Sequence, residues 1–208
     1  DIAGHLVGPK EPVLFIAEAG LSHFGSIDKA YRLVDLARES GADVFKTQAF
    51  KTDELVSGNL IEWKERLQSK EVGFDFLQSV KERCDDVGIT FMCTAHDETV
   101  VPWLEMLKVP AFKIGSGERG NLPFISSLAK HDLPLILSTG MYEQSHVLST
   151  LDAIEEAGCN HVALLHCVTS YPVPISQVNL GSIATLRSFF PGPVGYSDHT
   201  EGYLALVA

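Results

Sequence analysis

The chain has 208 residues, of which 45% are hydrophobic and 21% are charged, and its formal net charge is −11. This balance is typical of a folded globular protein and excludes a disordered chain. The negative charge argues against a nucleic-acid partner, because nucleic-acid phosphates would be repelled. The sequence has no apolar run near the roughly 18 residues of a membrane helix and does not start with a signal-peptide pattern, so we expect no membrane partner.

Short apolar segments rich in β-branched and aromatic residues alternate with amphipathic segments along the chain. The pattern predicts strands at residues 13–17, 43–47, 89–94, 111–114, 135–138, 161–166 and 194–197. It predicts helices near residues 27–40, 75–87, 98–107, 122–130, 143–157 and 180–190. Ser26 is expected to cap the first helix, and Gly41, Gly88 and Gly158 are expected to end helices in the left-handed conformation.

Strands that alternate with helices are compatible with either a doubly wound open sheet or a TIM-type (β/α)₈ barrel. The turn after the first strand, residues 18–25, lacks the GxGxxG pattern of a dinucleotide-binding sheet. Polar residues follow nearly every predicted strand, which favours the barrel, because a barrel collects its site from all of its strand ends. We therefore predict a single α/β domain over residues 1–208, a TIM (β/α)₈-type barrel with about seven strands in this chain.

A complete barrel of this type typically needs about 250 residues. Residues 201–208 look like the first turns of a seventh helix, and no eighth strand follows them. A barrel without that strand would expose two long edges. We therefore expect the chain to be incomplete at its C-terminus. Residues 49–74 form a connection that is either a lid over the site or a surface insertion.

Four cysteines, Cys84, Cys93, Cys159 and Cys167, occur without a CxxC pair. They lie in apolar strands or at helix ends, where a thiol packs as a small hydrophobic group. We interpret them as buried structural thiols rather than as a disulfide or zinc site. A reducing compartment suits them best, which predicts a cytoplasmic protein.

Two lysines, Lys46 and Lys113, lie in or at the end of apolar predicted strands. A buried ammonium group is costly unless it is paired or solvated. If the two strands end at the same face, the lysines form a positive pocket for phosphate or carboxylate. The alternative is two separate ion pairs with neighbours such as Glu18 or Glu118.

Further polar groups accompany the lysines. Lys46 and Gln48 share one face of their strand by alternation. Lys113 is followed by the glycine-rich loop 115–120, in which backbone amides and the Ser116 hydroxyl can approach an oxyanion. Thr94 supplies another hydroxyl at a strand end.

Histidines near predicted strand ends are candidates for metal binding or acid–base chemistry. Ser197 and His199 alternate after the last strand and place a hydroxyl and an imidazole on one side. Thr169 and Tyr171 follow the sixth strand and are positioned to meet an anion, and His23 is a further candidate after the first strand.

Six ordered motifs resemble those of the sialic acid synthase family, also called the N-acetylneuraminate synthases. The matching segments are residues 16–25, 41–48, 112–118, 137–141, 166–172 and 194–200. The resemblance extends from about Phe15 to the end of the chain. Members of this family join phosphoenolpyruvate to N-acetylmannosamine or a related sugar.

The resemblance implies a role for each matching residue. Those implied to bind phosphoenolpyruvate are Lys46, Thr94, Lys113, Ser116, Thr169, Tyr171 and Ser197. Gln48 and Glu118 are implied to contact the N-acetylated amino sugar. His199 is implied to be one of two histidines that hold Mn²⁺ or Mg²⁺, with Glu18 close to the metal. Glu18, Lys46, Lys113 and His199 are thus the implied catalytic residues.

The reaction implied is a metal-assisted attack of phosphoenolpyruvate on the open-chain sugar aldehyde, followed by C–O cleavage to a nonulosonic acid and phosphate. Ser22, Ala95 and His96 depart from the family pattern near the site, which leaves the acceptor sugar open. The resemblance also implies a homodimer, a second metal histidine beyond Ala208 and an antifreeze-like C-terminal domain. We therefore expect this chain alone to be inactive.

Two other functions fit parts of the pattern. One is a Schiff-base barrel aldolase with Lys113 as the nucleophile. The other is a non-catalytic paralogue that binds sugar or phosphoenolpyruvate without turnover.

Overall fold

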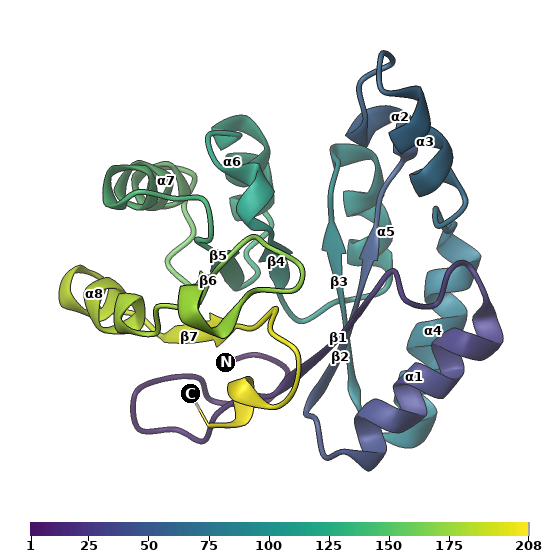
Figure 1. Cartoon of the computed structure of the whole chain (residues 1–208), viewed down its shortest axis with the longest axis horizontal. Coiled ribbons are helices and arrows are strands. Elements are labelled where there is room, and N and C mark those ends of the chain that lie inside the picture. The colour runs from purple at the N-terminus through teal and green to yellow at the C-terminus, as the bar shows by residue number, and fades with distance from the viewer. Residues whose placement is uncertain (208) are drawn as a thin grey trace. The chain divides into compact units, whose positions relative to one another are not determined.

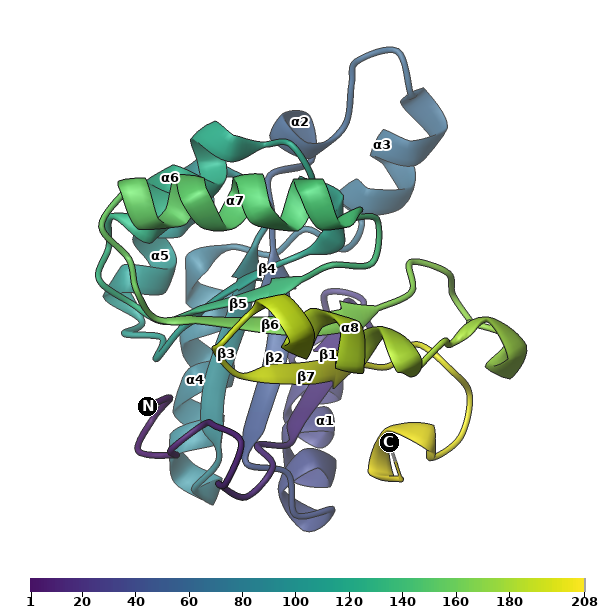
Figure 2. The same cartoon turned by 90° about the vertical axis from the view of Figure 1, so that its left-hand side faces the viewer.

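The computed structural model describes residues 1–207 and shows parallel strands alternating with helices (Figures 1 and 2). The strands are β1 (Ile16–Gly20), β2 (Val44–Ala49), β3 (Thr90–Ala95), β4 (Phe112–Ile114), β5 (Leu135–Ser138), β6 (Val162–Cys167) and β7 (Val194–Ser197). The seven predicted strands are thus confirmed, six of them within two residues at each end.

Helices follow the strands at nearly every predicted place. They are α1 (Ile27–Glu39), α2 (Thr52–Leu55), α3 (Ile61–Gln68), α4 (Phe74–Val87), α5 (Val101–Met106), α6 (Leu122–Ala129), α7 (Gln144–Glu156) and α8 (Gly181–Phe189). The predicted caps are confirmed in α1, where the Ser26 hydroxyl accepts from the Lys29 amide, and in α4, which ends at the left-handed Gly88 with φ +72°.

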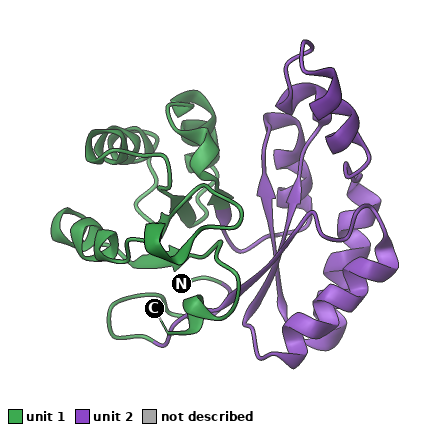
Figure 3. Ribbon diagram, viewed as in Figure 1, with its two compact units in different colours: residues 1–2, 6–11, 113–208 green, residues 3–5, 12–112 purple. Residues whose placement is uncertain are grey.

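The chain divides into two compact units (Figure 3). Unit 1 comprises residues 1–2, 6–11 and 113–208, and unit 2 comprises residues 3–5 and 12–112. The strands form one sheet of order β1-β2-β3 and another of order β4-β5-β6-β7. The prediction of one continuous domain stays a prediction.

Unit 2 is built around the three-stranded sheet, with α1 and α4 packed against each other. Arg83 of α4 donates two hydrogen bonds to Asp35 of α1, at 2.9 and 2.7 Å. The two helices also bury apolar side chains, among them Val34 of α1 and Leu77 of α4, each 0% exposed. In the sheet, Glu18 lies opposite Lys46, and Gln48 lies opposite Thr94.

Unit 1 contains the four-stranded sheet, and Figure 2 shows α7 and α8 lying across one of its faces. In the pairing of β6 with β7, His166 lies opposite Tyr196 and Cys167 lies opposite Ser197. Because successive strand residues point to opposite faces, these two pairs lie on different sides of the sheet.

The largest departure from the predicted elements is β1, which was expected at residues 13–17 and begins three residues later. The Phe15 amide donates to the Asp43 carboxylate at 2.8 Å, and its carbonyl accepts from the Asp43 and Val44 amides. Regular pairing with β2 then starts only at Ile16. Tertiary pairing, rather than the apolar run, sets this boundary.

Two other segments also differ in detail. The connection of residues 49–74 contains the short helices α2 and α3 rather than an irregular loop, and Trp63 in α3 is 53% exposed. At the C-terminus only a 3₁₀ turn at Leu204–Leu206 forms where a longer helix was expected, and Ala208 lies outside the described residues.

All four cysteines lie within the described residues. They are buried there, as predicted, and form no disulfide with one another. Burial raises the pKa of the Cys84 thiol to about 12 and that of Cys93 well above its usual range. These two thiols therefore stay protonated and act as packing groups. Within residues 1–207, no helix has the length and apolar character needed to cross a bilayer.

Candidate active site

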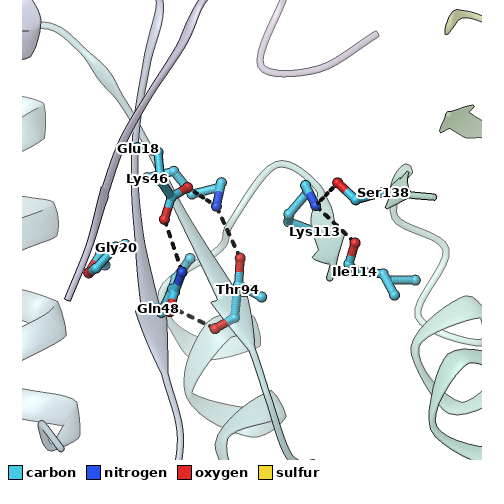
Figure 4. A network of polar contacts seen from close by, with 10 residues as sticks. Glu18, Gly20, Lys46, Gln48, Thr94, Lys113, Ile114 and Ser138 are labelled. Carbon is cyan, nitrogen blue, oxygen red and sulfur yellow. Dashed lines mark hydrogen bonds and ion pairs between the residues drawn. The ribbon is translucent and has the colours of Figure 1, made fainter. Parts of the chain in front are cut away.

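One polar cluster lies on the sheet of unit 2 (Figure 4). Lys46 of β2 forms an ion pair with Glu18 of β1 and donates a hydrogen bond to the Thr94 hydroxyl of β3 at 3.2 Å. Gln48 donates from Nε2 to the Glu18 carboxylate at 3.3 Å. The four residues form a continuous network across neighbouring strands, which we call the Lys46 cluster.

Strand geometry brings the Lys46 cluster together. Lys46 and Gln48 are two residues apart and both reach Glu18, which confirms that they share a face. Lys46 is only 6% exposed, whereas the Glu18 side chain is 41% exposed. A buried ammonium group therefore has one carboxylate and one hydroxyl as partners, and the carboxylate is open to solvent and to ligands.

Gly20 closes the β1 side of the same cluster. Its φ of +52° lies in the left-handed region, and a Cβ there would lie 3.5 Å from Glu18 Oε1 and 3.6 Å from Gln48 Nε2. The strand register shifts between Glu18 and Gly20. The irregular end of β1 lets the chain turn away directly behind the carboxylate.

A second cluster lies in unit 1, around Lys113 of β4. Its ammonium group donates to the Ile114 carbonyl at 2.9 Å and to the Ser138 hydroxyl of β5 at 2.7 Å (Figure 4). Lys113 is 8% exposed and Ser138 is 3% exposed. Ser138 was not among the predicted site residues, although its position as the last residue of an apolar strand was a usable signal.

Gly140 is the point at which the loops after β4, β5 and β6 meet. Its amide donates to the Ser116 hydroxyl at 2.9 Å. A Cβ on Gly140 would lie 2.6 Å from the Thr169 hydroxyl, 2.9 Å from the Ser116 hydroxyl and 3.0 Å from the Cys167 carbonyl. Only a glycine allows two hydroxyls and a backbone carbonyl to approach so closely.

His199 stands just beyond β7, and its ring orientation is fixed from two sides. Nδ1 lies 2.8 Å from the Val168 carbonyl, so the proton on Nδ1 is donated to that oxygen. The ring of Tyr171 lies against the imidazole, with centroids 4.1 Å apart. In the neutral ring, Nε2 is therefore the nitrogen with an available lone pair, as a metal ligand requires.

Cys167 also contacts His199, with Sγ 3.8 Å from Nδ1. Burial acts to raise the pKa of the Cys167 thiol, but hydrogen bonds with His199 and Ser116 and the charges of His199 and Lys113 outweigh it and lower the pKa. The same Cys167 contact is the main cause that raises the pKa of His199. The sequence interpretation placed Cys167 among the packing thiols and missed its position beside the candidate site.

The predicted site residues therefore gather in two groups. Unit 2 holds Glu18, Lys46, Gln48 and Thr94, and unit 1 holds Lys113, Ser116, Thr169, Tyr171, Ser197 and His199. The carboxylate of Glu118, the remaining predicted sugar contact, accepts a hydrogen bond from the Asn121 side chain (Nδ2) at 2.8 Å. The alternative ion pair with Glu18 is confirmed for Lys46, and the convergence of Lys46 with Lys113 stays a prediction.

Other histidines take different roles. His23 is 1% exposed, accepts from the Gly25 amide at Nδ1 and packs against Phe76. Burial lowers its pKa. Among the described residues, no three His, Cys, Asp or Glu side chains are grouped to hold a metal ion. His199 thus offers one ligand by itself.

Comparison with known proteins finds a matching family and several relatives. The model of the NeuB family matches residues 33–208. An uncharacterised protein of Methanocaldococcus jannaschii is 42% identical over 99% of this chain and 61% of its own length. The N,N'-diacetyllegionaminic acid synthase of Legionella pneumophila is 37% identical over 95% of this chain and 60% of its own length.

A solved structure shows the same arrangement. The N-acetylneuraminic acid synthetase of Leptospira borgpetersenii, crystallised with citrate, is 32% identical and aligns with a TM-score of 0.94 over 99% of this chain and 73% of that one. The chain spans about three fifths of the length of the curated relatives. The fold is a (β/α)₈-type barrel fold, as predicted, with seven strands among the described residues. The chain belongs to the NeuB family, whose model covers it from residue 33 to its last residue.

Proposed function

We propose that the protein containing this chain condenses phosphoenolpyruvate with an N-acetylmannosamine-like sugar aldehyde to give a nonulosonic acid and phosphate. The observation that carries the proposal is the meeting of Ser116, Thr169 and Cys167 at Gly140, next to Lys113 and His199, in a chain of the NeuB family. This arrangement concentrates donors that suit an oxyanion. We further propose that the protein is a cytoplasmic homodimer.

The residues of unit 1 would bind the phosphoenolpyruvate anion. Lys113 supplies a buried positive charge whose hydrogen bonds fix its position. Hydroxyls of Ser116, Thr169, Tyr171 and Ser197 would complete the shell, with Lys46 and Thr94 contributing from unit 2. Prearranged donors of this kind stabilise developing negative charge without reorganising during the reaction.

Gln48 and Glu118 would orient the sugar so that its aldehyde carbon meets C3 of phosphoenolpyruvate. A C–C bond forms as the C2–C3 double bond supplies its electrons, leaving C2 as an oxocarbenium. The electron pair of the aldehyde C=O π bond moves to its oxygen, which takes up a proton and becomes a hydroxyl. Water adds at C2 and loses a proton, and the tetrahedral intermediate expels phosphate by C–O cleavage as its C2 hydroxyl loses a proton and becomes the keto group. Glu18, whose carboxylate is partly exposed, would orient that water.

His199 would hold Mn²⁺ or Mg²⁺ through Nε2, together with a second histidine that the family resemblance implies beyond Ala208. The donated Nδ1 proton supports this role because it leaves Nε2 as the acceptor. When bound, the divalent cation supplies Lewis acidity that polarises the sugar aldehyde. Metal and proton compete for the same nitrogen, so binding weakens as pH falls.

The test is phosphate release by a form of the protein that extends beyond Ala208. It is assayed with phosphoenolpyruvate, Mn²⁺ and a panel of N-acetylated sugars. We expect release with at least one sugar and its loss on addition of EDTA. We also expect no turnover by the 208-residue chain alone. If the longer protein releases phosphate with none of the sugars, the result would instead favour a non-catalytic protein that binds sugar or phosphoenolpyruvate.

The Schiff-base alternative makes a separate prediction. Lys113 donates to two oxygen acceptors, which suits an ammonium group that grips an anion more than a neutral amine nucleophile. We expect borohydride to trap no pyruvate adduct on Lys113. A trapped adduct, with activity that survives EDTA, would overturn the proposed mechanism.

A further inference from the structure

A pocket of about 290 Å³ lies between α7, α8 and the end of β6, wholly within unit 1. Its walls are the loop after β5 with the start of α7, the end of β6, and the segment from Gln177 through α8. The volume is at the small end of the range for small-molecule sites. It fits one molecule of about the size of a monosaccharide.

The pocket lies mainly on the helix-covered face of the sheet. His166 lines it, and its ring stacks on Tyr196 with centroids 5.8 Å apart. The next residue, Cys167, also borders the pocket, but its thiol reaches His199 on the opposite face. The lining that His166 shares with residues of α7 and α8 places its side chain on the face that these helices cover (Figure 2). The pocket therefore adjoins the group formed by Gly140, Ser116, Thr169 and Cys167, which we call the oxyanion cluster, and shares Gly140 and Cys167 with it, but most of its lining comes from the other side, from α7, α8 and the segment before α8.

The lining combines polar and apolar side chains and includes no Lys or Arg. Amide and hydroxyl groups come from Gln144, Gln177, Asn179 and Ser182, and apolar surface comes from Leu186 and Phe189. No Lys or Arg is among the lining residues, and the Glu143 carboxylate already caps α7. An anion such as phosphoenolpyruvate would therefore lose its hydration here without gaining a counter-charge.

We propose that this pocket is a second binding site, for a neutral molecule that carries hydroxyl and acetamido groups. Amide side chains pair with hydroxyl and acetamido groups, while Phe189 and Leu186 take the acetyl methyl group and the apolar face of a sugar ring. N-acetylated amino sugars combine these features. The choice of this sugar class rests on the proposed function, whereas the neutral character rests on the lining alone.

Two lining positions connect the pocket to the candidate active site. The Gly140 amide donates to Ser116, and the Val168 carbonyl accepts from His199. A ligand that moves either backbone segment changes the position of a residue proposed to act in catalysis. Occupancy of the pocket would therefore change the positions of Ser116 and His199 in the candidate active site.

The test is titration of the ¹⁵N-labelled 208-residue chain with N-acetylmannosamine, followed by amide chemical shifts. We expect shifts within residues 142–147 and 177–189, and smaller ones at Ser116 and His199. Thr185→Trp places a large side chain in the pocket from the exposed surface of α8 and should abolish the shifts in residues 177–189. Ser188→Trp, on the same helix outside the lining, is the matched control and should keep them.

Three outcomes would overturn the inference: no shifts in these segments at millimolar sugar, shifts that persist in Thr185→Trp, or equal shifts with phosphoenolpyruvate. Glu118→Gln separates this inference from the proposed function. That variant removes a predicted sugar contact at the active site and should leave the shifts in residues 177–189 unchanged. Loss of those shifts in Glu118→Gln would mean that they report active-site binding, and this too would overturn the second site.

Discussion

Gly140 is the residue on which the geometry of the oxyanion cluster depends most directly. In Gly140→Ala, the new Cβ would meet two hydroxyls and the Cys167 carbonyl at 3.0 Å or less. The hydroxyls can rotate away but the carbonyl cannot, so the loops must separate. We expect phosphoenolpyruvate affinity, measured by calorimetry, to fall at least tenfold, and the free energy of unfolding to fall by about 1–3 kcal/mol.

Gly117→Ala is the matched control, because nothing lies within 4 Å of a Cβ there and its φ is not in the left-handed region. It should bind and unfold like the wild type in urea titrations. If Gly140→Ala also behaves like the wild type, the close approach of the three loops is not what organises the cluster.

Substitutions of Tyr171 test whether its aromatic ring or its hydroxyl fixes the orientation of the His199 imidazole. The ring lies 4.1 Å from the imidazole although the side chain is 73% exposed. We expect Tyr171→Phe to keep the His199 ring in its Nδ1-protonated orientation and Tyr171→Ala to loosen it. Ring ¹⁵N shifts of His199 measure the tautomer directly. Equal spectra for the two variants would show that the ring contact does not position His199.

How much of the site could be predicted depends on whether a contact is local in sequence. The shared face of Lys46 and Gln48 was predictable because strand alternation is fixed by two neighbouring residues. Ser138 and Cys167 were missed because their partners, Lys113 and His199, lie 25 and 32 residues away. Cys167 lies in the motif of residues 166–172 and Cys84 lies in none of the six motifs, but that position does not show that the Cys167 thiol contacts His199.

The segment that contains α2 and α3 is held by hydrogen bonds between its two ends rather than by buried apolar side chains of α3. Glu71 accepts from the Lys51 ammonium at 3.0 Å and from the Thr52 amide at 2.8 Å, whereas α3 buries none of its residues. Burial acts to raise the pKa of Glu71, but these hydrogen bonds outweigh it and lower the pKa. The ionised carboxylate therefore stabilises this connection above its unfolded pKa, and the stabilisation is lost as pH falls through the folded pKa.

Glu71→Gln should therefore loosen residues 52–72 locally. We expect amide hydrogen exchange there to accelerate about tenfold, since a hydrogen bond to a charged group contributes about 1.5 kcal/mol. The thermal midpoint should change little because the α1–α4 core is untouched. Glu62→Gln on the exposed surface of α3 is the control. Unchanged exchange in Glu71→Gln would show that another contact secures this connection.

Predictability at the level of elements follows from the same distinction between local and distant interactions. The bounds of α4, the helix that contains Cys84, were predicted within one residue because a glycine terminates it. The start of β1 was predicted too early because the backbone amide and carbonyl of Phe15 form hydrogen bonds with Asp43, which is far away in sequence. The helices α2 and α3 lacked an apolar stripe and gave no periodic signal.

At the scale of the whole molecule, His23 links stability to pH. It is buried, its Nε2 has no hydrogen-bond partner among the described residues, and burial lowers its pKa. Unfolded histidine binds a proton near pH 6.5, so the unfolded state holds more protons below that pH. The contribution of His23 to the free energy of unfolding is therefore complete above a pH of about 6.5. It falls as the pH drops toward the pKa of His23 in the folded state, by at most about 1.4 kcal/mol per pH unit.

His23→Asn should remove this slope, because Asn keeps an acceptor for the Gly25 amide and does not titrate. The measurement is urea unfolding at several values of pH between about 5 and 8. Subtracting the variant from the wild type cancels the contributions of the other groups. A difference that does not vary with pH would show that His23 has the same pKa in the folded and unfolded states.

The predicted convergence of Lys46 and Lys113 is the whole-molecule hypothesis on which the proposed chemistry depends most. Lys46 contacts Glu18 and Thr94 in unit 2, and Lys113 contacts Ile114 and Ser138 in unit 1. If both ammonium groups grip a single phosphoenolpyruvate, the ligand must protect both from acylation with one shared midpoint. Lysine reactivity, followed by mass spectrometry during a phosphoenolpyruvate titration, measures this, and exposed Lys108 serves as the unprotected control. Protection of Lys113 alone would confine the anion site to unit 1 and leave Lys46 as the structural partner of Glu18.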